Sequence, residues 1–348
     1  MKSLIVSSTR KGAGKTSISI GLARALGKKL GYVKPLGDRF LYRKKRLWDY
    51  DAALLANVLE LNEEPETISI GFDHSKLRYM YDRTSIFGEL DRILQTVGKD
   101  RDAALIECGR DLSYGASVCL DPLTISQETG QPVLIVAGGE EDSIADDLAF
   151  VKRFVGVDEA TVAGVIINKV VHVDEFESVH LPEIEKLGIK VFGVIPHQEV
   201  LTTRSVGTVA DKLFARVLAG EDGMQRTIKT VVVGAMSANA ALSDSLITQP
   251  EKLVITSGDR SDMILAALDA GGTAAIVLTN NIVPPANVVS KAAQMGVPLL
   301  LVPGDTFAVA MQVDRIESLI TPGDQEKIEL VTSLVRDHVD LEAVAALI

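Results

Sequence analysis

The residues from Ser8 to Ser17 carry the clearest chemical pattern in this chain. They read Ser-Thr-Arg-Lys-Gly-Ala-Gly-Lys-Thr-Ser, with Gly14-Lys15-Thr16 at the centre. Glycines at 12 and 14 let backbone N–H groups approach phosphate oxygens and allow the positive φ that such a loop needs. A lysine here neutralises β- and γ-phosphate charge, and a hydroxyl next to it binds Mg²⁺. The stretch therefore predicts a phosphate-binding loop.

The sequence on either side predicts the elements that such a loop requires. The apolar run Leu4-Ile5-Val6 indicates a strand over 2–7, and amphipathic spacing indicates a helix over 16–27. Thr9 stands where the usual pattern has a glycine. We expect nucleotide to bind along residues 10–17, which are Arg10, Lys11, Gly12, Ala13, Gly14, Lys15, Thr16 and Ser17. The alternative is a turn rich in lysine and glycine that binds nothing.

Composition narrows the class of protein. The 348 residues are 47% hydrophobic but only 5% aromatic, which suits an α/β chain with buried Val/Ile/Leu strands. A formal net charge of −11 argues against nucleic-acid binding, which needs a basic face. Cys108 and Cys119 are too few for a disulfide framework. With neither a signal peptide nor a membrane-length apolar run, we expect a cytoplasmic protein that binds no membrane.

Strand and helix patterns alternate through the first 220 residues. Strands are expected at 2–7, 32–35, 103–107, 132–137, 162–168 and 191–196, and helices at 16–27, 51–61, 84–97, 116–129, 140–154, 174–187 and 208–219. Residues 62–83 are expected to form a surface loop or hairpin. This alternation predicts a doubly wound parallel sheet, in which ligands bind at the carboxyl ends of the strands. The polar loop residues and strand-end residues that fall there are Lys15, Thr16, Lys34, Glu107, Gly138, Asn168 and Pro196.

Three polar features beside this edge allow two interpretations each. Glu107 ends an apolar strand, where an acid favours a Mg²⁺ role over capping of the next helix. Asp51 is expected to cap or begin the helix over 51–61. The basic segment 39–46 is either a solvated loop face or an electropositive rim for an anionic ligand.

A second, smaller α/β domain is expected over residues 224–348, after a linker at 221–223. Its expected strands lie at 229–234, 252–256, 274–279 and 298–302, and its helices at 237–243, 260–269, 285–295, 306–313 and 324–347. Asp259, Asn281 and Asp305 follow strands at its own sheet edge. They are expected either to cap helices or to contact a ligand.

The first domain resembles dethiobiotin synthetase and the related cobyrinic acid a,c-diamide synthase type of ATP-dependent enzymes. The resemblance covers residues 2–220 and rests on five segments: 8–17, Gly31-Tyr32-Val33-Lys34-Pro35, Asp51-Ala52-Ala53-Leu54, 162–168, and Phe192-Gly193-Val194-Ile195-Pro196. Thr9 is typical of this branch. The sequence departs from the family at 108–111, where Cys-Gly-Arg-Asp replaces small residues that shape the substrate side.

The resemblance implies ATP and Mg²⁺ as cofactors and a homodimer as the assembly. It implies that Lys15 binds phosphate and that Lys34 lies between phosphate and substrate, as the two catalytic lysines. It places Thr16, Asp51 and Glu107 around Mg²⁺ and Asn168 at the adenine edge, and we count Pro196 among the nucleotide-binding residues.

The second domain resembles the DRTGG domain, most closely over residues 258–268. Thr279-Asn280-Asn281 replaces the Thr-Gly-Gly of that family. The same two domains in this order are similar to the N-terminal part of long bacterial phosphotransacetylases. We expect this chain to lack the acetyltransferase domain of those proteins.

Two functions remain open at this point. One is a ligase or ATPase that activates a small carboxylate by phosphoryl transfer from Mg-ATP. The other is a regulatory ATP-sensing protein, without turnover of a small molecule, whose DRTGG-like domain mediates dimerisation or binds an effector. Either would use a small anionic partner. A scaffold with a degenerate loop is disfavoured because Gly14-Lys15-Thr16 is intact.

Overall fold

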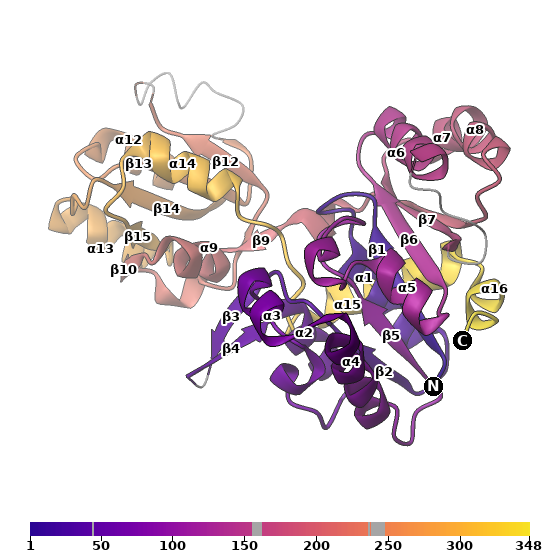
Figure 1. The fold of residues 1–348 in the computed structure, drawn as a ribbon. Coiled ribbons are helices and arrows are strands. Elements are labelled where there is room, and N and C mark those ends of the chain that lie inside the picture. The colour runs from indigo at the N-terminus through magenta and orange to yellow at the C-terminus, as the bar shows by residue number, and fades with distance from the viewer. Residues whose placement is uncertain (44, 155–161, 236, 238–247) are drawn as a thin grey trace. The chain divides into compact units, whose positions relative to one another are not determined.

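The chain forms two compact units (Figure 1). The computed structural model describes residues 1–43, 45–154, 162–235, 237 and 248–348. Unit 1 contains residues 1–198 and 320–348, and unit 2 contains residues 199–319. These bounds differ from the expected division at 220, and they assign the C-terminal tail to unit 1. The helix expected at 237–243 lies outside the described residues except at its first position.

Unit 1 is built on a parallel sheet of six strands in the described part of the chain. The strand order is β2-β5-β1-β6-β7-β8, which confirms the predicted doubly wound sheet. The strands are β1 (Ser3–Ser8), β2 (Leu30–Val33), β5 (Ala103–Glu107), β6 (Val133–Gly138), β7 (Val162–Val170) and β8 (Val191–Pro196). Nearly continuous burial of β1, β2, β5 and β6 explains why each reads as an unbroken apolar run.

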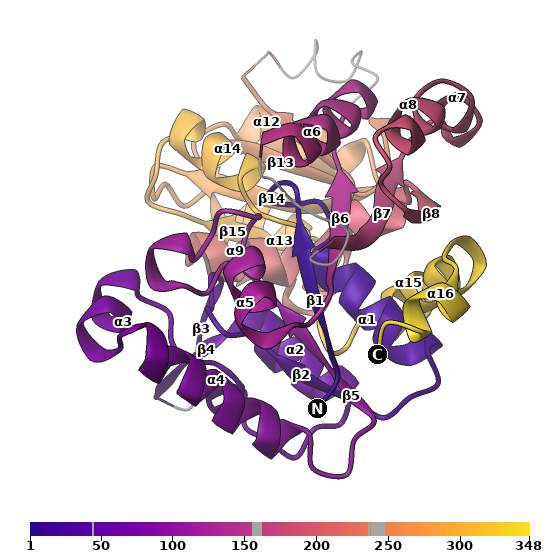
Figure 2. The same cartoon turned by 45° about the vertical axis from the view of Figure 1, so that its right-hand side comes forward.

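Helices cover both faces of this sheet. Figure 2 shows α1, α15 and α16 together on one face and α4 and α5 on the other. The helices are α1 (Lys15–Ala25), α2 (Tyr50–Val58), α3 (His74–Met80), α4 (Arg83–Val97), α5 (Pro122–Thr129), α6 (Glu141–Phe154), α7 (Val173–Val179), α8 (Leu181–Lys186), α15 (Gln325–His338) and α16 (Leu341–Ala345). Single-turn 3-10 helices lie at η1 (Pro65–Ile68) and η2 (Ala116–Val118).

Two segments of unit 1 are more regular than their sequences predict. Residues 62–83, expected as a loop or hairpin, contain η1 and α3, whose N-cap Asp73 accepts from the backbone N–H of Lys76. The basic segment forms an antiparallel ribbon of β3 (Phe40–Arg43) and β4 (Arg46–Asp49) instead of a loop. Alternation along the ribbon buries Trp48 on one side and exposes Phe40 and Tyr42 on the other.

The C-terminal helices return to unit 1 instead of extending unit 2. A Cβ on Gly21 of α1 would lie 2.3 Å from Val335 of α15, so the two helices pack at close range. Beyond α15, the N–H of Asp340 donates to the carbonyl of Phe192 in β8 at 2.8 Å. The amphipathic pattern predicted one helix over 324–347, whereas the structure has two, α15 and α16, with Val339 extended between them. The pattern also did not indicate which unit these helices would cover.

Unit 2 has a five-stranded sheet in the order β10-β15-β14-β13-β12. Its strands are β10 (Arg216–Ala219), β12 (Thr230–Val233), β13 (Lys252–Ser257), β14 (Thr273–Thr279) and β15 (Leu299–Leu301), parallel except for β10. Its helices are α9 (Val206–Leu213), α12 (Ser261–Asp269), α13 (Ala286–Gln294) and α14 (Thr306–Asp314). A short ribbon joins β9 (Arg204–Ser205) to β11 (Thr227–Ile228), and further 3-10 turns lie at η3 (Glu199–Thr202) and η4 (Glu221–Gly223).

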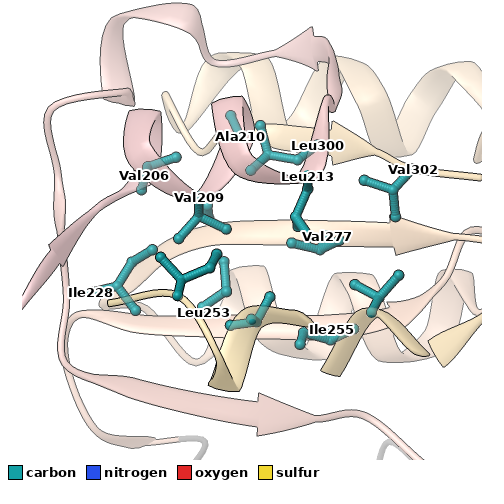
Figure 3. Packing of buried hydrophobic residues seen from close by; sticks show 14 of the residues in the cluster. Val206, Val209, Ala210, Leu213, Ile228, Leu253, Ile255, Val277, Leu300 and Val302 are labelled. Atoms are coloured by element: carbon teal, nitrogen blue, oxygen red, sulfur yellow. The ribbon is translucent and has the colours of Figure 1, made fainter. Parts of the chain in front are cut away.

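Apolar layers lie on both faces of this second sheet. Figure 3 shows one of them, where Val209 and Leu213 of α9 pack over Leu253, Val277 and neighbouring strand residues. The expected helix over 208–219 is therefore wrong in its second half. Residues 216–219 form β10 because pairing with β15 satisfies their backbone groups, a long-range contact that local spacing does not report.

Among the described residues, no helix is both long and apolar enough to cross a membrane.

Candidate nucleotide-binding site

The loop between β1 and α1 has the backbone geometry of an anion cradle. Gly12 and Gly14 have φ of 82° and 95°, in the left-handed region that disfavours other residues. Gly14 is the N-cap of α1, and a Cβ there would lie 2.2 Å from Nδ2 of Asn168. Only glycine fits this position, so the N-terminus of α1 is left open to an anion.

Lys15 and Thr16 open α1 and lie at the carboxyl edge of the sheet. Lys15 is 8% exposed, and burial together with the nearby charge of Lys34 lowers the pKa of its ammonium. The Thr16 hydroxyl donates to Oε1 of Glu107 at 3.0 Å. This hydrogen bond joins the loop to the end of β5.

Lys34 lies at the centre of the site and is fully buried. Its Nζ is 3.0 Å from Oδ2 of Asp51, 3.0 Å from Oε1 of Glu107 and 3.3 Å from Oδ1 of Asp38. Burial opposes its charge, but the carboxylates of Asp51 and Glu107 outweigh burial and raise the pKa of Lys34 well above its ordinary value. Lys34 is therefore a fixed cation held by three acids.

Asp51 is equally constrained. Arg39 Nη1 lies 3.0 Å from both of its oxygens. Burial alone would raise the pKa of Asp51, but Lys34 and then Arg39 lower it to about 2. Asp51 lies in the first turn of α2, and the cap of that helix is Asp49, whose Oδ1 accepts from the N–H of Ala52 at 3.0 Å. Asp51 is expected from the sequence to cap or begin this helix; instead the helix begins at Tyr50, one residue earlier, and Asp49 caps it.

Three residues of this cluster escaped the sequence analysis as site residues. Asp38 and Arg39 follow Pro35 by a few residues, and both of their backbone N–H groups donate to Oδ2 of Asp49. Asp38, Asp49 and Asp51 have carboxylate oxygens within 4.8 Å of one another. The available signal was the pattern of three aspartates over 38–51 around a strand-end lysine, which only the ribbon β3–β4 brings together.

The predicted metal ligands fit a divalent cation in their chemistry. Glu107 is 0% exposed, and its Oε2 has no hydrogen-bond partner in the part of the chain that the structure describes. A buried carboxylate oxygen without a partner is costly unless a cation or water meets it. Thr16 contacts the same carboxylate, while Asp51 is bridged to it through Lys34.

The remaining predicted residues belong to the loop or to strand ends at the same edge of the sheet, and they do not contact the Lys34 cluster in the hydrogen bonds described here. Asn168, at the end region of β7, donates from Nδ2 to the carbonyl of Ala13 at 2.9 Å, and Lys169 Nζ donates to Gly12 at 2.8 Å. Arg10 makes a bidentate ion pair with Asp147 of α6, with both contacts at 2.7 Å. Lys11 is exposed and Ser17 lies in the first turn of α1. Pro196 ends β8, three strands away from β1 in the sheet order.

The ring of Tyr114 packs against the loop that follows Glu107. A Cβ on Gly109 would lie 1.9 Å from the Tyr114 ring, so the ring rests directly on the glycine. The Arg110 guanidinium lies 5.1 Å from the centre of the same ring, and the Tyr114 hydroxyl donates to the carbonyl of Gly37 at 3.4 Å. Residues 108–111, which depart from the resembled family, are thus packed against a neighbouring side chain.

At the corresponding edge of unit 2, one of three expected caps is present. Asp305 caps α14 by accepting from the N–H of Ala308 at 2.8 Å, whereas α12 and α13 begin without a side-chain cap from Asp259 or Asn281. Asn280 and Asn281 have φ of 61° and 54°. Asparagine tolerates this left-handed region, which explains how it replaces two glycines.

A glycine-lined loop between a parallel strand and a helix, with a buried lysine and a strand-end acid, defines a P-loop, ATP-binding fold. Residues 2–205 match the AAA domain family, and residues 208–316 match the DRTGG domain. The chain belongs to the AAA domain family and carries a DRTGG domain after it.

The curated relatives include phosphate acetyltransferases. That of Pseudomonas aeruginosa is 27% identical over 379 residues, covering 98% of this chain and 51% of the relative. Cobyrinate a,c-diamide synthase of Methanocaldococcus jannaschii is 25% identical over 212 residues, covering 57% of this chain and 41% of the relative. The chain spans about half the length of the phosphate acetyltransferases it matches.

Among solved structures, MinD in the MinC:MinD cell division complex of Aquifex aeolicus is similar with a TM-score of 0.36 and 17% identity. The match covers 58% of this chain and 84% of that one. A similarity at this level carries no argument about function.

Proposed function

We propose that unit 1 binds Mg-ATP at residues 10–17 and acts as a nucleotide sensor. The observation that carries this proposal is the charge balance around Lys34. Its ammonium already contacts three carboxylates, Asp38, Asp51 and Glu107, before any nucleotide is bound. An incoming phosphate and cation compete for these same partners, so binding must rearrange the cluster.

Each residue of the site has a role in this proposal. The N-terminus of α1 and Lys15 bind the phosphates, and Asn168 and Lys169 fix the loop through its carbonyls. Thr16 and Glu107 would hold Mg²⁺, together with Asp51 once Lys34 moves from between them. The metal supplies neutralisation of phosphate charge, and Lys34, released toward the phosphates, adds a second positive charge.

Sensing is favoured over acid phosphorylation by the packing after Glu107. Tyr114 rests on Gly109, and Arg110 lies over the Tyr114 ring, on the side where a small carboxylate would approach. The convergence of Lys15, Lys34 and a strand-end acid favours the second candidate, ATP-dependent activation of a small carboxylate. The DRTGG domain fits the first candidate, as the part whose dimerisation or effector binding follows nucleotide state.

Nucleotide binding is tested by titrating the protein with a fluorescent ATP analogue and Mg²⁺. Lys15→Ala should weaken affinity at least about a hundredfold, because it removes a desolvated charge from the phosphates. Lys99→Ala, at an exposed lysine that follows α4 in the same unit and lies outside the loop, is the control and should change affinity less than about threefold. Equal affinity of wild type and Lys15→Ala would overturn the site.

The two candidate functions are separated by ADP release and sedimentation. A sensor should change oligomeric state on adding Mg-ATP and release ADP at the same slow rate with any small acid. Stimulation of ADP release more than about tenfold by one acid in a broad panel would instead establish the ligase candidate.

A further inference from the structure

A cavity lies within unit 2, at the amino ends of its parallel strands. Its volume is about 530 Å³, within the range of small-molecule sites. The lining includes Arg226, Glu251 at the start of β13, and Gly272 and Thr273 at the start of β14. This edge is opposite to the carboxyl edge that carries the DRTGG segment and Asp305. The cavity is therefore separate from the motif for which the domain is named.

Arg226 brings an unbalanced positive charge to this cavity. Its guanidinium is partly buried, and its Nη1 donates to the carbonyl of Thr273 at 3.3 Å. The lining acid Glu251 is already paired with Lys229 at 2.6 Å. Among the described residues, no carboxylate forms an ion pair with Arg226. A guanidinium presents five N–H donors in a fork that fits an oxyanion, so most of its bonding capacity is unused.

A second cation lies next to the same cavity. Lys252 is 0% exposed, and its Nζ donates to the carbonyls of Gln249 and Gly271. Burial lowers the pKa of this ammonium. Carbonyl dipoles satisfy its hydrogen bonds without a formal negative charge, and one of those carbonyls belongs to the lining residue Gly271, so a positive charge next to the cavity favours an anion over a cation.

One wall of the cavity is apolar. It is lined by the buried residues Leu268, Ala274 and Val297, and by Met295, which is 40% exposed. An inorganic anion would leave this wall in contact with water, whereas a compact apolar body would cover it. Glu251 also has φ of 57° at the edge of the cavity, a conformation that non-glycine residues keep where the surroundings enforce it.

We propose that this cavity binds a small organic anion, a carboxylate or phosphate monoester on a compact apolar body, with Arg226 as its charge partner. The site is independent of the phosphate loop in unit 1. Under the proposed sensor function, this anion would be the effector to which the DRTGG domain responds.

Fluorine NMR provides the test, with para-trifluoromethylbenzoate and para-trifluoromethylphenyl phosphate as probes and para-trifluoromethylbenzamide as the neutral control. Both anions should bind the full chain, and the neutral amide should bind at least about tenfold more weakly. The tighter of the two anions identifies the head group. Binding of the amide equal to that of the anions would overturn the proposal.

Variants locate the binding. Arg226→Met should weaken the tighter anion at least about tenfold, while Arg315→Met, at an exposed arginine of the same unit, should leave it unchanged. Met295→Glu places a carboxylate on the exposed rim and should also compete with the probe, without disturbing the core. Unfolding curves that match wild type confirm that each variant is folded.

Two further outcomes bear on the proposal. Lys15→Ala must leave probe affinity unchanged, since a loss there would assign the probe to the phosphate loop and overturn the second site. Probe binding that survives both Arg226→Met and Met295→Glu in folded protein would overturn it as well. Inorganic phosphate that displaces the probe with equal affinity would show that the apolar wall contributes nothing and would overturn the organic class.

Discussion

The two units each contain a fully buried lysine, and the partners of these two lysines differ in formal charge. Lys34 follows β2 at the carboxyl edge of the first sheet and contacts three carboxylates. Lys252 begins β13 at the amino edge of the second sheet and contacts two backbone carbonyls. The pKa of Lys34 is raised well above its ordinary value, and burial lowers that of Lys252. Burial alone therefore does not define the role of a lysine, because the charge of its partners decides it.

The Lys34 cluster in unit 1 and the cavity near Lys252 in unit 2 favour ligands of opposite charge. The cluster around Lys34 has more acids than bases, and Oε2 of Glu107 has no hydrogen-bond partner among the residues that the structure describes, so the cluster favours a cation. In the cavity next to Lys252, the lining acid Glu251 is paired with Lys229, and Arg226 forms no ion pair with any carboxylate that the structure describes, so this cavity favours an anion. Four changes, ordered from the largest expected effect to the smallest, test this contrast.

Lys34→Met should lower the unfolding free energy of unit 1 by about 3–5 kcal/mol, because it leaves buried carboxylates without their cation. Trp48 is the single tryptophan of the chain, and its fluorescence reports on unit 1 in a urea titration. Adding Glu107→Gln to Lys34→Met should recover part of the loss, since one uncompensated charge is removed. A cost below about 1 kcal/mol would contradict the charge balance described here.

Acid should weaken unit 1 through Asp51. The pKa of Asp51 is lowered to about 2 in the folded protein, below the unfolded value of about 4. Its contribution of about 2 kcal/mol is therefore complete above about pH 4 and is lost as pH falls toward 2. Asp51→Asn should remove this part of the pH dependence, measured as the difference in unfolding free energy from wild type. If the unfolding free energies of wild type and Asp51→Asn change with pH at the same slope, the prediction is wrong.

Asp305→Ala should destabilise unit 2 by about 1 kcal/mol, the usual value of a helix N-cap. Asp305→Asn keeps an acceptor for the N–H of Ala308 and should retain most of that stability. Circular dichroism during urea unfolding measures both. If the asparagine variant loses as much stability as the alanine variant, the negative charge of Asp305 itself is required. The carboxyl edge of the second sheet would then depend on acid charge, as the first does.

Lys252→Met should change the unfolding free energy of unit 2 by no more than about 1 kcal/mol. The loss of two bonds to carbonyls is offset by removal of a buried charge that no acid in the described part of the chain compensates. The same circular dichroism titration measures the change. A loss as large as that of Lys34→Met would show that Lys252 has a partner of opposite charge and would remove the contrast between the units.

The sequence was sufficient for the parallel sheet and for the position of the phosphate loop. Strands buried on both faces read as continuous apolar runs, and their carboxyl ends must meet at one edge, which brings Lys34 to Glu107. It was not sufficient for the partners of Lys34. Asp38 reaches the lysine through a loop whose course depends on the ribbon β3–β4, and such ribbon pairing is a tertiary contact.

Local sequence patterns also did not predict where the chain divides into its two units. A glycine-rich segment at 220–223 resembled a linker, yet η4 lies there inside unit 2. The amphipathic spacing of α15 showed that one face must be covered but not that α1 and β8 cover it. Periodicity specifies the burial of a face, whereas its neighbour is specified by the shape of the rest of the unit.

The return of α15 to α1 has a consequence for synthesis of the protein on the ribosome. Unit 2 interrupts unit 1 in the sequence. The surface of α1 beside Gly21 therefore stays uncovered until residues 325–338 have left the exit tunnel. Unit 2, contiguous at 199–319, completes its own fold first. Unit 1 is thus begun before unit 2 and completed after it, and a chain released early at residue 319 carries all of unit 2 attached to an incomplete unit 1.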